Sequence, residues 1–172
     1  MAHCEYCEII NGQRKAVKIY EDDKVLALLA DKPAALGHMI MLPKNHYPII
    51  EQVPDYIVSH IFAVANKLSI SAFEGMNALG TNILVNNGVA AGQTSSHFMV
   101  HIIPRKEGDN INLSWPAKQL GEEQLSTIMM QIKEHTEGIG EFEKEKQEPI
   151  KIERDKTIAI EDFKVKCLDR IP

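Results

Sequence analysis

The sequence predicts one soluble globular domain that contains both strands and helices. Its 172 residues, with 44% hydrophobic and 25% charged side chains, have the size and composition of a single folded unit. Short apolar segments that alternate or form buried runs indicate strands, whereas one long segment has the 3.6-residue spacing of a helix. We found no internal repeat. We expect a domain over residues 1–135 and a charged C-terminal extension over residues 136–172.

Five segments have the pattern of strands. Residues 17–20 alternate, an acidic turn follows at 21–23, and residues 25–29 form a buried-type apolar run, so these segments are expected to form a hairpin. The further strands are expected over residues 39–42, 82–86 and 97–103.

Two segments have the pattern of helices. Pro54 suits the first turn of a helix, and apolar residues then recur at helical intervals as far as Gly75. That stripe consists of Ile57, Ile61, Val64, Ala65, Leu68 and Ala72. Other apolar side chains, among them Phe62, Ile70 and Phe73, lie outside it, so a second face of this helix is expected to meet another subunit. A last helix carries Leu125, Ile128, Met129 and Ile132.

The C-terminal residues are strongly charged. Residues 141–148 are almost entirely Glu, Lys and Gln, which is typical of a solvated segment. Residues 149–172 alternate around four isoleucines and are expected to return to the domain as an edge strand.

Charge and hydropathy exclude two classes of partner. With 24 acidic and 19 basic residues the net charge is -5, and no basic stripe is present that would neutralise a nucleic-acid backbone. The longest apolar stretches, at 25–30 and 57–65, are shorter than the roughly 18–20 residues that span a bilayer. The N-terminus has no pattern of a secretory or transit peptide. We therefore expect a cytoplasmic protein without a nucleic-acid or membrane partner.

Four residues are candidate metal ligands: Cys4, Cys7, His46 and His97. The Cys-x-x-Cys spacing in a reducing compartment favours metal or redox chemistry. Two thiolates and two imidazoles suit tetrahedral zinc, and four protein ligands leave no open position, so such a site would be structural. The alternatives are two free thiols, a surface histidine at 46 and a hydrogen-bonded sheet histidine at 97.

The predicted strand at 97–103 carries two histidines and a methionine on one face. Its alternation directs Phe98, Val100 and Ile102 to the core. The opposite face carries His97, Met99, His101 and Ile103. A glycine-rich segment over residues 88–94 precedes the strand, and its backbone amides and Thr94 hydroxyl are suited to hold an anion. We therefore predict a phosphate pocket.

Together these motifs resemble the histidine triad (HIT) family of nucleotide-binding proteins. The resemblance covers residues 4–135 and rests on Asn86-x-Gly88, Ala91-Gly92-Gln93-Thr94, His97-x-x-x-His101-Ile102-Ile103-Pro104-Arg105, and Gly37-His38 followed by Pro43-Lys44-x-His46. It implies an α+β fold with a roughly five-stranded antiparallel sheet, a long helix and a C-terminal helix. It also implies a homodimer through the long helix, a pocket for a purine nucleoside monophosphate or a phosphate-like anion, and zinc at Cys4, Cys7, His46 and His97.

The sequence departs from the family pattern at the position of the nucleophile. In the pattern His-x-His-x-His the middle histidine attacks the α-phosphate and forms a nucleotidyl-histidine, whereas this chain has Met99 at that position. A thioether is neither an acid nor a base and is a poor nucleophile toward phosphorus. Loss of a nucleophile lowers turnover by a factor of roughly 10⁶ in a comparable enzyme. The resemblance therefore implies absent or weak catalysis.

A second departure concerns ribose binding. The family's ribose-binding aspartate is matched here by Ala30, and the adjacent Asp31 is expected to face the opposite side because a one-residue shift in an extended chain reverses the side chain. The resemblance still assigns Asn86, Gln93, Thr94 and His101 to phosphate binding, with His38 behind the missing nucleophile.

Three functions remain open from the sequence. The first is a HIT-type nucleotide- or phosphate-binding protein with absent or weak nucleotidyl hydrolase or transferase activity. The second is an active nucleoside phosphoramidate or dinucleoside polyphosphate hydrolase, in which His97, His101 or water attacks instead. The third is a zinc-stabilised dimeric interaction module whose charged extension recruits a partner. A soft-metal site at His97, Met99 and His101 is a fourth idea, which competes with the use of His97 by zinc.

Overall fold

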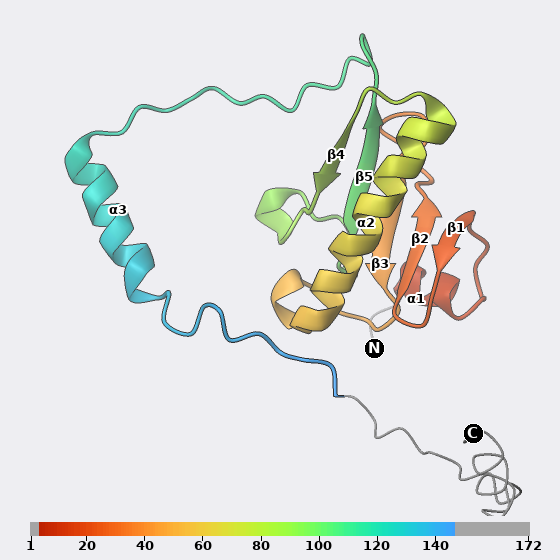
Figure 1. Ribbon diagram of the computed structural model, residues 1–172, viewed down its shortest axis with the longest axis horizontal. Helices are drawn as coiled ribbons and strands as arrows, with labels where there is room; N and C mark the ends of the chain where they lie inside the picture. Colours follow the sequence, from red (N-terminus) through yellow and green to blue (C-terminus); the bar gives the residue numbers. More distant parts are fainter. Residues whose placement is uncertain (1–3, 147–172) are drawn as a thin grey trace, which may run out of the picture.

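The computed structural model describes residues 4–146 and contains a five-stranded antiparallel sheet with the strand order β1-β2-β3-β5-β4 (Figure 1). The strands are β1 (Lys18–Glu21), β2 (Val25–Leu29), β3 (Met39–Pro43), β4 (Gly80–Leu84) and β5 (Val100–Arg105). All five predicted strands are present, and the α+β fold is confirmed. The last strand begins at Val100, so His97 and Met99 lie in the segment that leads into it. The predicted edge strand within 149–172 falls outside the described residues.

One face of the sheet is covered by the long helix α2 (Asp55–Met76), which the helical spacing predicted (Figure 1). Its buried apolar residues are Ile57, Ile61, Ala65, Leu68 and Ala72, which pack with Val25, Ala27, Met39, Met41, Val100 and Ile102 from the strands. The helix ends at Met76 and is capped by Asn77, whose backbone is left-handed (φ 52°). By length and hydropathy α2 would also pass as a membrane span, but its buried face belongs to this core.

The opposite face of the sheet is covered by α1 (Glu5–Ile10), a helix that the sequence did not predict. Ile9 is buried there against residues of β2 and β3: Leu26, Leu28, Ile40 and Leu42. Because consecutive strand residues point to opposite faces, the sheet is apolar on both sides, one for α2 and one for α1. Two short 3-10 turns, η1 (Ile50–Gln52) and η2 (Val89–Ala91), lie in the connecting loops.

The predicted C-terminal helix is present as α3 (Glu122–Glu134) but stands away from the sheet (Figure 1). None of its residues is buried, and the apolar residues that predicted it are 41–61% exposed. The chain then returns to the N-terminal end of α2. There the Glu143 amide donates to the Asp55 carboxylate at 2.8 Å, and Lys24 pairs with Glu145 at 2.6 Å. The predicted division at residue 135 remains a prediction.

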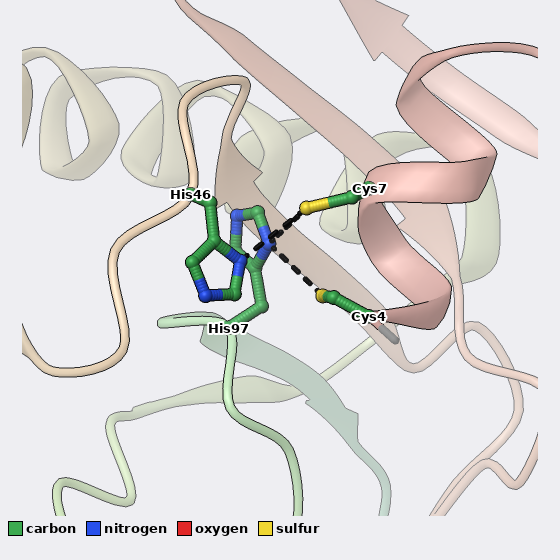
Figure 2. A group of neighbouring side chains, drawn as sticks. All are labelled: Cys4, Cys7, His46 and His97. Atoms are coloured by element: carbon green, nitrogen blue, oxygen red, sulfur yellow. Dashed lines mark hydrogen bonds between the residues drawn. The ribbon is translucent and has the colours of Figure 1, made fainter. Parts of the chain in front are cut away.

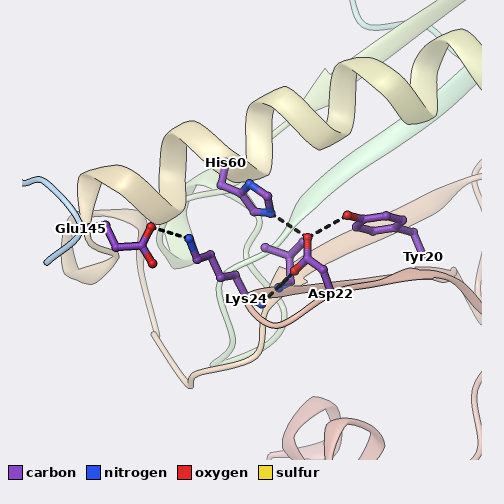
Figure 3. Close-up of polar contacts among 6 residues, drawn as sticks. Tyr20, Asp22, Lys24, His60 and Glu145 are labelled. Carbon is purple, nitrogen blue, oxygen red and sulfur yellow. Dashed lines mark hydrogen bonds and ion pairs between the residues drawn. The ribbon is translucent and has the colours of Figure 1, made fainter. Parts of the chain in front are cut away.

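The turn between β1 and β2 is fixed to α2 by Asp22 (Figure 3). One carboxylate oxygen accepts hydrogen bonds from the amides of Lys24 and Val25 at 2.8 Å each. The other accepts from the Tyr20 hydroxyl at 2.8 Å and from Nε2 of His60, on α2, at 2.7 Å. Burial acts to raise the pKa of Asp22, but these hydrogen bonds outweigh it and hold the pKa well below its ordinary value.

Candidate metal centre and anion-binding cavity

The four predicted metal ligands come together between α1, the loop after β3 and the segment before β5 (Figure 2). Cys4 is the N-cap residue of α1, and Cys7 lies three residues further along the helix. Their sulfurs and the ring nitrogens of His46 and His97 all lie within 4.8 Å of one another. One turn of α1 brings the two cysteines to the same side of the helix. The loop after β3 supplies His46, and the segment before β5 supplies His97.

The distances between these atoms fit a tetrahedral zinc site. Cys7 Sγ lies 3.3 Å from His46 Nδ1, and His97 Nδ1 lies 3.6 Å from Cys4 Sγ and 3.7 Å from Cys7 Sγ. Bonds of the usual zinc lengths to sulfur and nitrogen place ligands of a tetrahedron roughly 3.3–3.8 Å apart. The four residues therefore have both the chemistry and the spacing of a metal centre.

The ring of His97 is already oriented as a metal ligand. It is fully buried, and its Nε2–H donates to the carbonyl oxygen of Pro43 at 2.9 Å, which leaves the lone pair of Nδ1 directed at the two thiols. Burial lowers the pKa of His97, so the ring stays neutral. Burial raises the pKa of Cys7 to about 11, and the hydrogen bond with Cys4 and the charge of that side chain act in the same direction.

Beside the cluster lies a cavity of about 410 Å³, which several of the predicted site residues line. His38 and Ile40 reach it from the start of β3, and Met99 and His101 reach it from the β5 segment. Thr94 and Ala30 also line it. The structure thus brings His38, Thr94, Met99 and His101 to one cavity.

The two histidines form a chain of hydrogen bonds that ends in this cavity. The Ala34 amide donates to Nδ1 of His38 at 3.0 Å, so the proton of a neutral His38 ring is on Nε2. That Nε2 lies 3.1 Å from Nδ1 of His101 and donates to it. His101 therefore carries its own proton on Nε2, where it is available to an anion. Burial lowers the pKa of both rings, and for His38 the charge of His101 adds to this, so both are neutral at pH 7.

The close packing of Gly37 helps to place His38. Gly37 has a positive φ of 80°, and a Cβ at this position would overlap the end of the Met76 side chain. Glycine at this position lets the chain turn beneath the end of α2 and enter β3 with the His38 ring buried.

Met99 is in contact with both the cavity and the apolar cluster beneath α1. It is partly buried, lines the cavity with His38 and His101, and packs against the cluster of Ile9 and the β2 and β3 residues. The predicted alternation is confirmed on the other side, where Phe98, Val100 and Ile102 are in the core with α2. A methionine at this position fills space and supplies neither a proton nor an imidazole nitrogen.

Two predicted phosphate ligands, Asn86 and Gln93, are not part of the cavity lining. The Gln93 side chain accepts from the Gly88 amide at 2.7 Å and donates to the carbonyl oxygens of Pro48 at 2.6 Å and Ser95 at 2.7 Å. It therefore holds the shape of the loop that carries Thr94. Asn86 lies beside Gly92 in the same loop.

The other residues that line the cavity were missed from the sequence. They are Glu5 and Tyr6 from α1, Arg14 from the loop after it, and Asp31 and Lys32 from the loop after β2. Asp31 lines the same cavity as Ala30, contrary to the expectation that it would face the opposite side. The reason is that β2 ends at Leu29, so strand alternation no longer applies to these two residues. No sequence pattern marked these residues, because α1 is too short to show a helical period and the end of β2 is not specified by alternation.

These features define a small α+β protein with a Cys2His2 cluster next to a cavity lined by paired histidines. A model of the HIT domain matches residues 11–108, more than half of the chain, and the chain belongs to this family. Adenylylsulfatase HINT3 from Arabidopsis thaliana is 38% identical over 122 residues, which cover 71% of this chain and 60% of that relative, so this chain spans less than two thirds of its length.

Two solved structures agree with this assignment. A HIT family protein from Bacillus anthracis has a TM-score of 0.72 and 38% identity, covering 77% of this chain and 96% of that chain. A zinc-bound histidine triad family protein from Mycobacterium smegmatis has a TM-score of 0.61 and 34% identity, covering 76% of this chain and 96% of that chain. The predicted HIT-like fold is therefore confirmed.

Proposed function

We propose that this HIT protein binds a phosphorylated ligand in the cavity beside the cysteine-histidine cluster, with nucleotidyl hydrolase or transferase activity absent or weak. The ligand class is a purine nucleoside monophosphate or a phosphate-like anion. The observation that carries the proposal is the chain of two neutral rings from His38 to His101, which leaves an N–H donor facing a cavity where Met99 lies in place of a third imidazole. The adenylylsulfatase named above supports a phosphorylated adenylyl ligand class.

The weak catalysis follows from the chemistry of the Met99 side chain. Formation of a nucleotidyl-enzyme requires an electron pair that attacks phosphorus, and a thioether sulfur is poorly suited to this. A loss of roughly 10⁶ in rate corresponds to about 8 kcal/mol of barrier. A hydrogen bond from His101 to a phosphate oxygen contributes about 1.5–3 kcal/mol, which favours binding but does not replace the nucleophile.

The test of this proposal is Met99→His. The change is expected to produce a covalent nucleotidyl-enzyme with adenosine phosphoramidate, detected as a mass increase of the intact protein, whereas the wild type gives none. Met129→His, at an exposed position of α3, serves as the control and should behave as the wild type. Rapid turnover of adenosine phosphoramidate by wild-type protein free of contaminating hydrolase would overturn the inactive assignment and favour the active hydrolase.

We further propose that zinc fills the cluster as a structural ion. The two sulfurs and two ring nitrogens complete a tetrahedron without an open position, so the metal would hold α1 to the sheet and would not touch substrate. The zinc-bound relative from Mycobacterium smegmatis supports the choice of metal.

A homodimer is the assembly that we propose for the exposed apolar surface. Phe62, Ile70 and Phe73 on α2 are 40–43% exposed, and β4 is an edge strand with Ile83 38% exposed. A second copy would cover these apolar side chains and pair or shield the strand edge. Cytoplasmic location and the lack of a nucleic-acid or membrane partner remain part of the proposal, on the grounds of charge and cysteine use given above.

A further inference from the structure

A second cavity adjoins the one that carries the histidine pair. It has a volume of about 330 Å³. The side chains that line it are Cys4, Glu5, Arg14, Thr94, Ser95 and Ser96. Three of these, Glu5, Arg14 and Thr94, also line the first cavity. Because the same side chains border both spaces, the two cavities meet at these residues.

Part of the second cavity is formed by three consecutive hydroxyl side chains, at residues 94–96. The Gln93 side chain holds this loop, since it donates to the carbonyl oxygens of Pro48 at 2.6 Å and Ser95 at 2.7 Å. The Ser95 hydroxyl oxygen accepts from the His97 amide at 3.2 Å, which leaves its own O–H to donate. The loop therefore presents hydroxyl donors on a backbone that is already held in place.

The cation of the second cavity is Arg14. Its Nη1 donates to Glu5 Oε2 at 2.9 Å, and the two side chains are 45% and 48% exposed. The Arg14 amide also donates to the carbonyl oxygen of Glu8 at 3.3 Å, which ties this loop to α1. A guanidinium has five N–H donors in a planar fork. Among the residues that the structure describes, the pair with Glu5 uses only Nη1, so Nε and Nη2 are available to the oxygens of a ligand.

The first cavity has room and surface for a nucleoside without the use of Arg14. Tyr6, Ala30 and Ile40 supply aromatic and apolar surface there, which suits the organic part of a nucleotide. Thr94 and His101 lie in the same cavity, at the proposed position of the phosphate. A group joined to that phosphate on the side of Thr94 would enter the second cavity, where it meets a guanidinium and hydroxyl groups.

We propose that the second cavity holds the second anionic group of a ligand in which two such groups are joined, as in a nucleoside diphosphate. Arg14 then makes the protein prefer this ligand to a nucleoside monophosphate. The inference rests on the proposed function, because the first phosphate must lie at His101 and Thr94. The second phosphate, one bridging oxygen further along, accepts hydrogen bonds from the Arg14 fork and the Ser95 hydroxyl. Since Met99 supplies no nucleophile, the diphosphate is held and not cleaved.

Calorimetric titration of the full chain with ADP and AMP, without added divalent cations, tests the inference. ADP is expected to bind about tenfold more tightly than AMP, a modest gain because Arg14 is half exposed and Glu5 repels the anion. Arg14→Gln should abolish this difference and leave the affinity for AMP unchanged, because the guanidinium meets only the second phosphate. Lys15→Gln, the neighbouring exposed cation outside both cavities, is the matched control and should keep the full preference for ADP.

The outcomes separate the inference from the function on which it rests. If AMP binds and ADP binds no more tightly, the second subsite is absent while phosphate-ligand binding stands. If Arg14→Gln and Lys15→Gln reduce the preference equally, it reflects overall charge and the inference fails. Lys32 lines only the first cavity, so loss of the preference in Lys32→Gln but not in Arg14→Gln would also overturn it. If neither nucleotide binds at millimolar concentration, the proposed function fails as well. Circular dichroism checks that the variants fold.

Discussion

Replacement of His46 by asparagine is expected to remove the metal and lower the thermal stability of the protein. His46 is the exposed member of the cluster, so the substitution removes a ligand with little loss of packing. An ion present at about 1,000 times its dissociation constant stabilises the folded chain by about 4.1 kcal/mol. For a chain of this size each kcal/mol corresponds to about 2–4 °C, so the melting temperature should fall by about 8–16 °C.

The assay combines metal analysis with thermal unfolding in the presence and absence of a chelator. Wild-type protein should contain about one zinc per chain and should lose stability on chelation, whereas His46→Asn should contain little zinc and respond weakly. His135→Asn, an exposed histidine at the end of α3, is the control and should match the wild type. Wild-type protein that binds no zinc, and that melts at one temperature with and without chelator, would refute the assignment of a metal centre.

Three further outcomes are expected. Asp22→Asn should lower the free energy of unfolding by about 1–3 kcal/mol at pH 7. Because folding lowers the pKa of Asp22, the stabilisation by its carboxylate is present above the unfolded pKa near 3.9 and is lost as the pH falls below that value. Urea unfolding across pH 2–7 would detect this loss. Gln93→Ala should increase amide exchange in residues 88–95, since three hydrogen bonds of that loop are lost; unchanged exchange would contradict this. Phe73→Glu should convert a dimer into monomers in sedimentation experiments, while Glu74→Gln, its exposed neighbour on α2, should not.

The sheet and α2 were predictable because their side chains alternate between core and solvent at the period of the element. The stripe from Ile57 to Ala72 marks a helix face, and the alternation from Phe98 to Ile102 marks a strand face. The cysteine-histidine cluster was predictable for a different reason. Thiolate and imidazole are the preferred zinc ligands, and the Cys4-x-x-Cys7 spacing pointed to metal or redox chemistry. The choice of His46 and His97 as the other two members depended on the resemblance to the HIT family, because spacing alone does not single out two distant histidines.

The elements that the sequence did not reveal are those fixed by tertiary contacts. Helix α1 has six residues, too few for a periodic pattern and too few to be stable alone, and it forms where Ile9 meets the sheet. The position of Asp31 depended on the residue at which β2 ends, which alternation does not specify. For α3 the pattern predicted a helix correctly, but an apolar stripe does not say which surface covers it.

The short helix α1 also links the cluster to the cavity, and this leads to a last prediction. Cys4 and Cys7 belong to the cluster, while Glu5 and Tyr6 between them line the cavity, and Arg14 is held by Glu5. Removing zinc should therefore loosen the cavity wall as well as the fold. If the ordered lining is then populated in about one molecule in ten, affinity for AMP falls about tenfold. Calorimetry with chelated and zinc-loaded protein below the melting temperature measures this, and equal affinities would show that Ile9 and its apolar neighbours hold α1 in place without the metal.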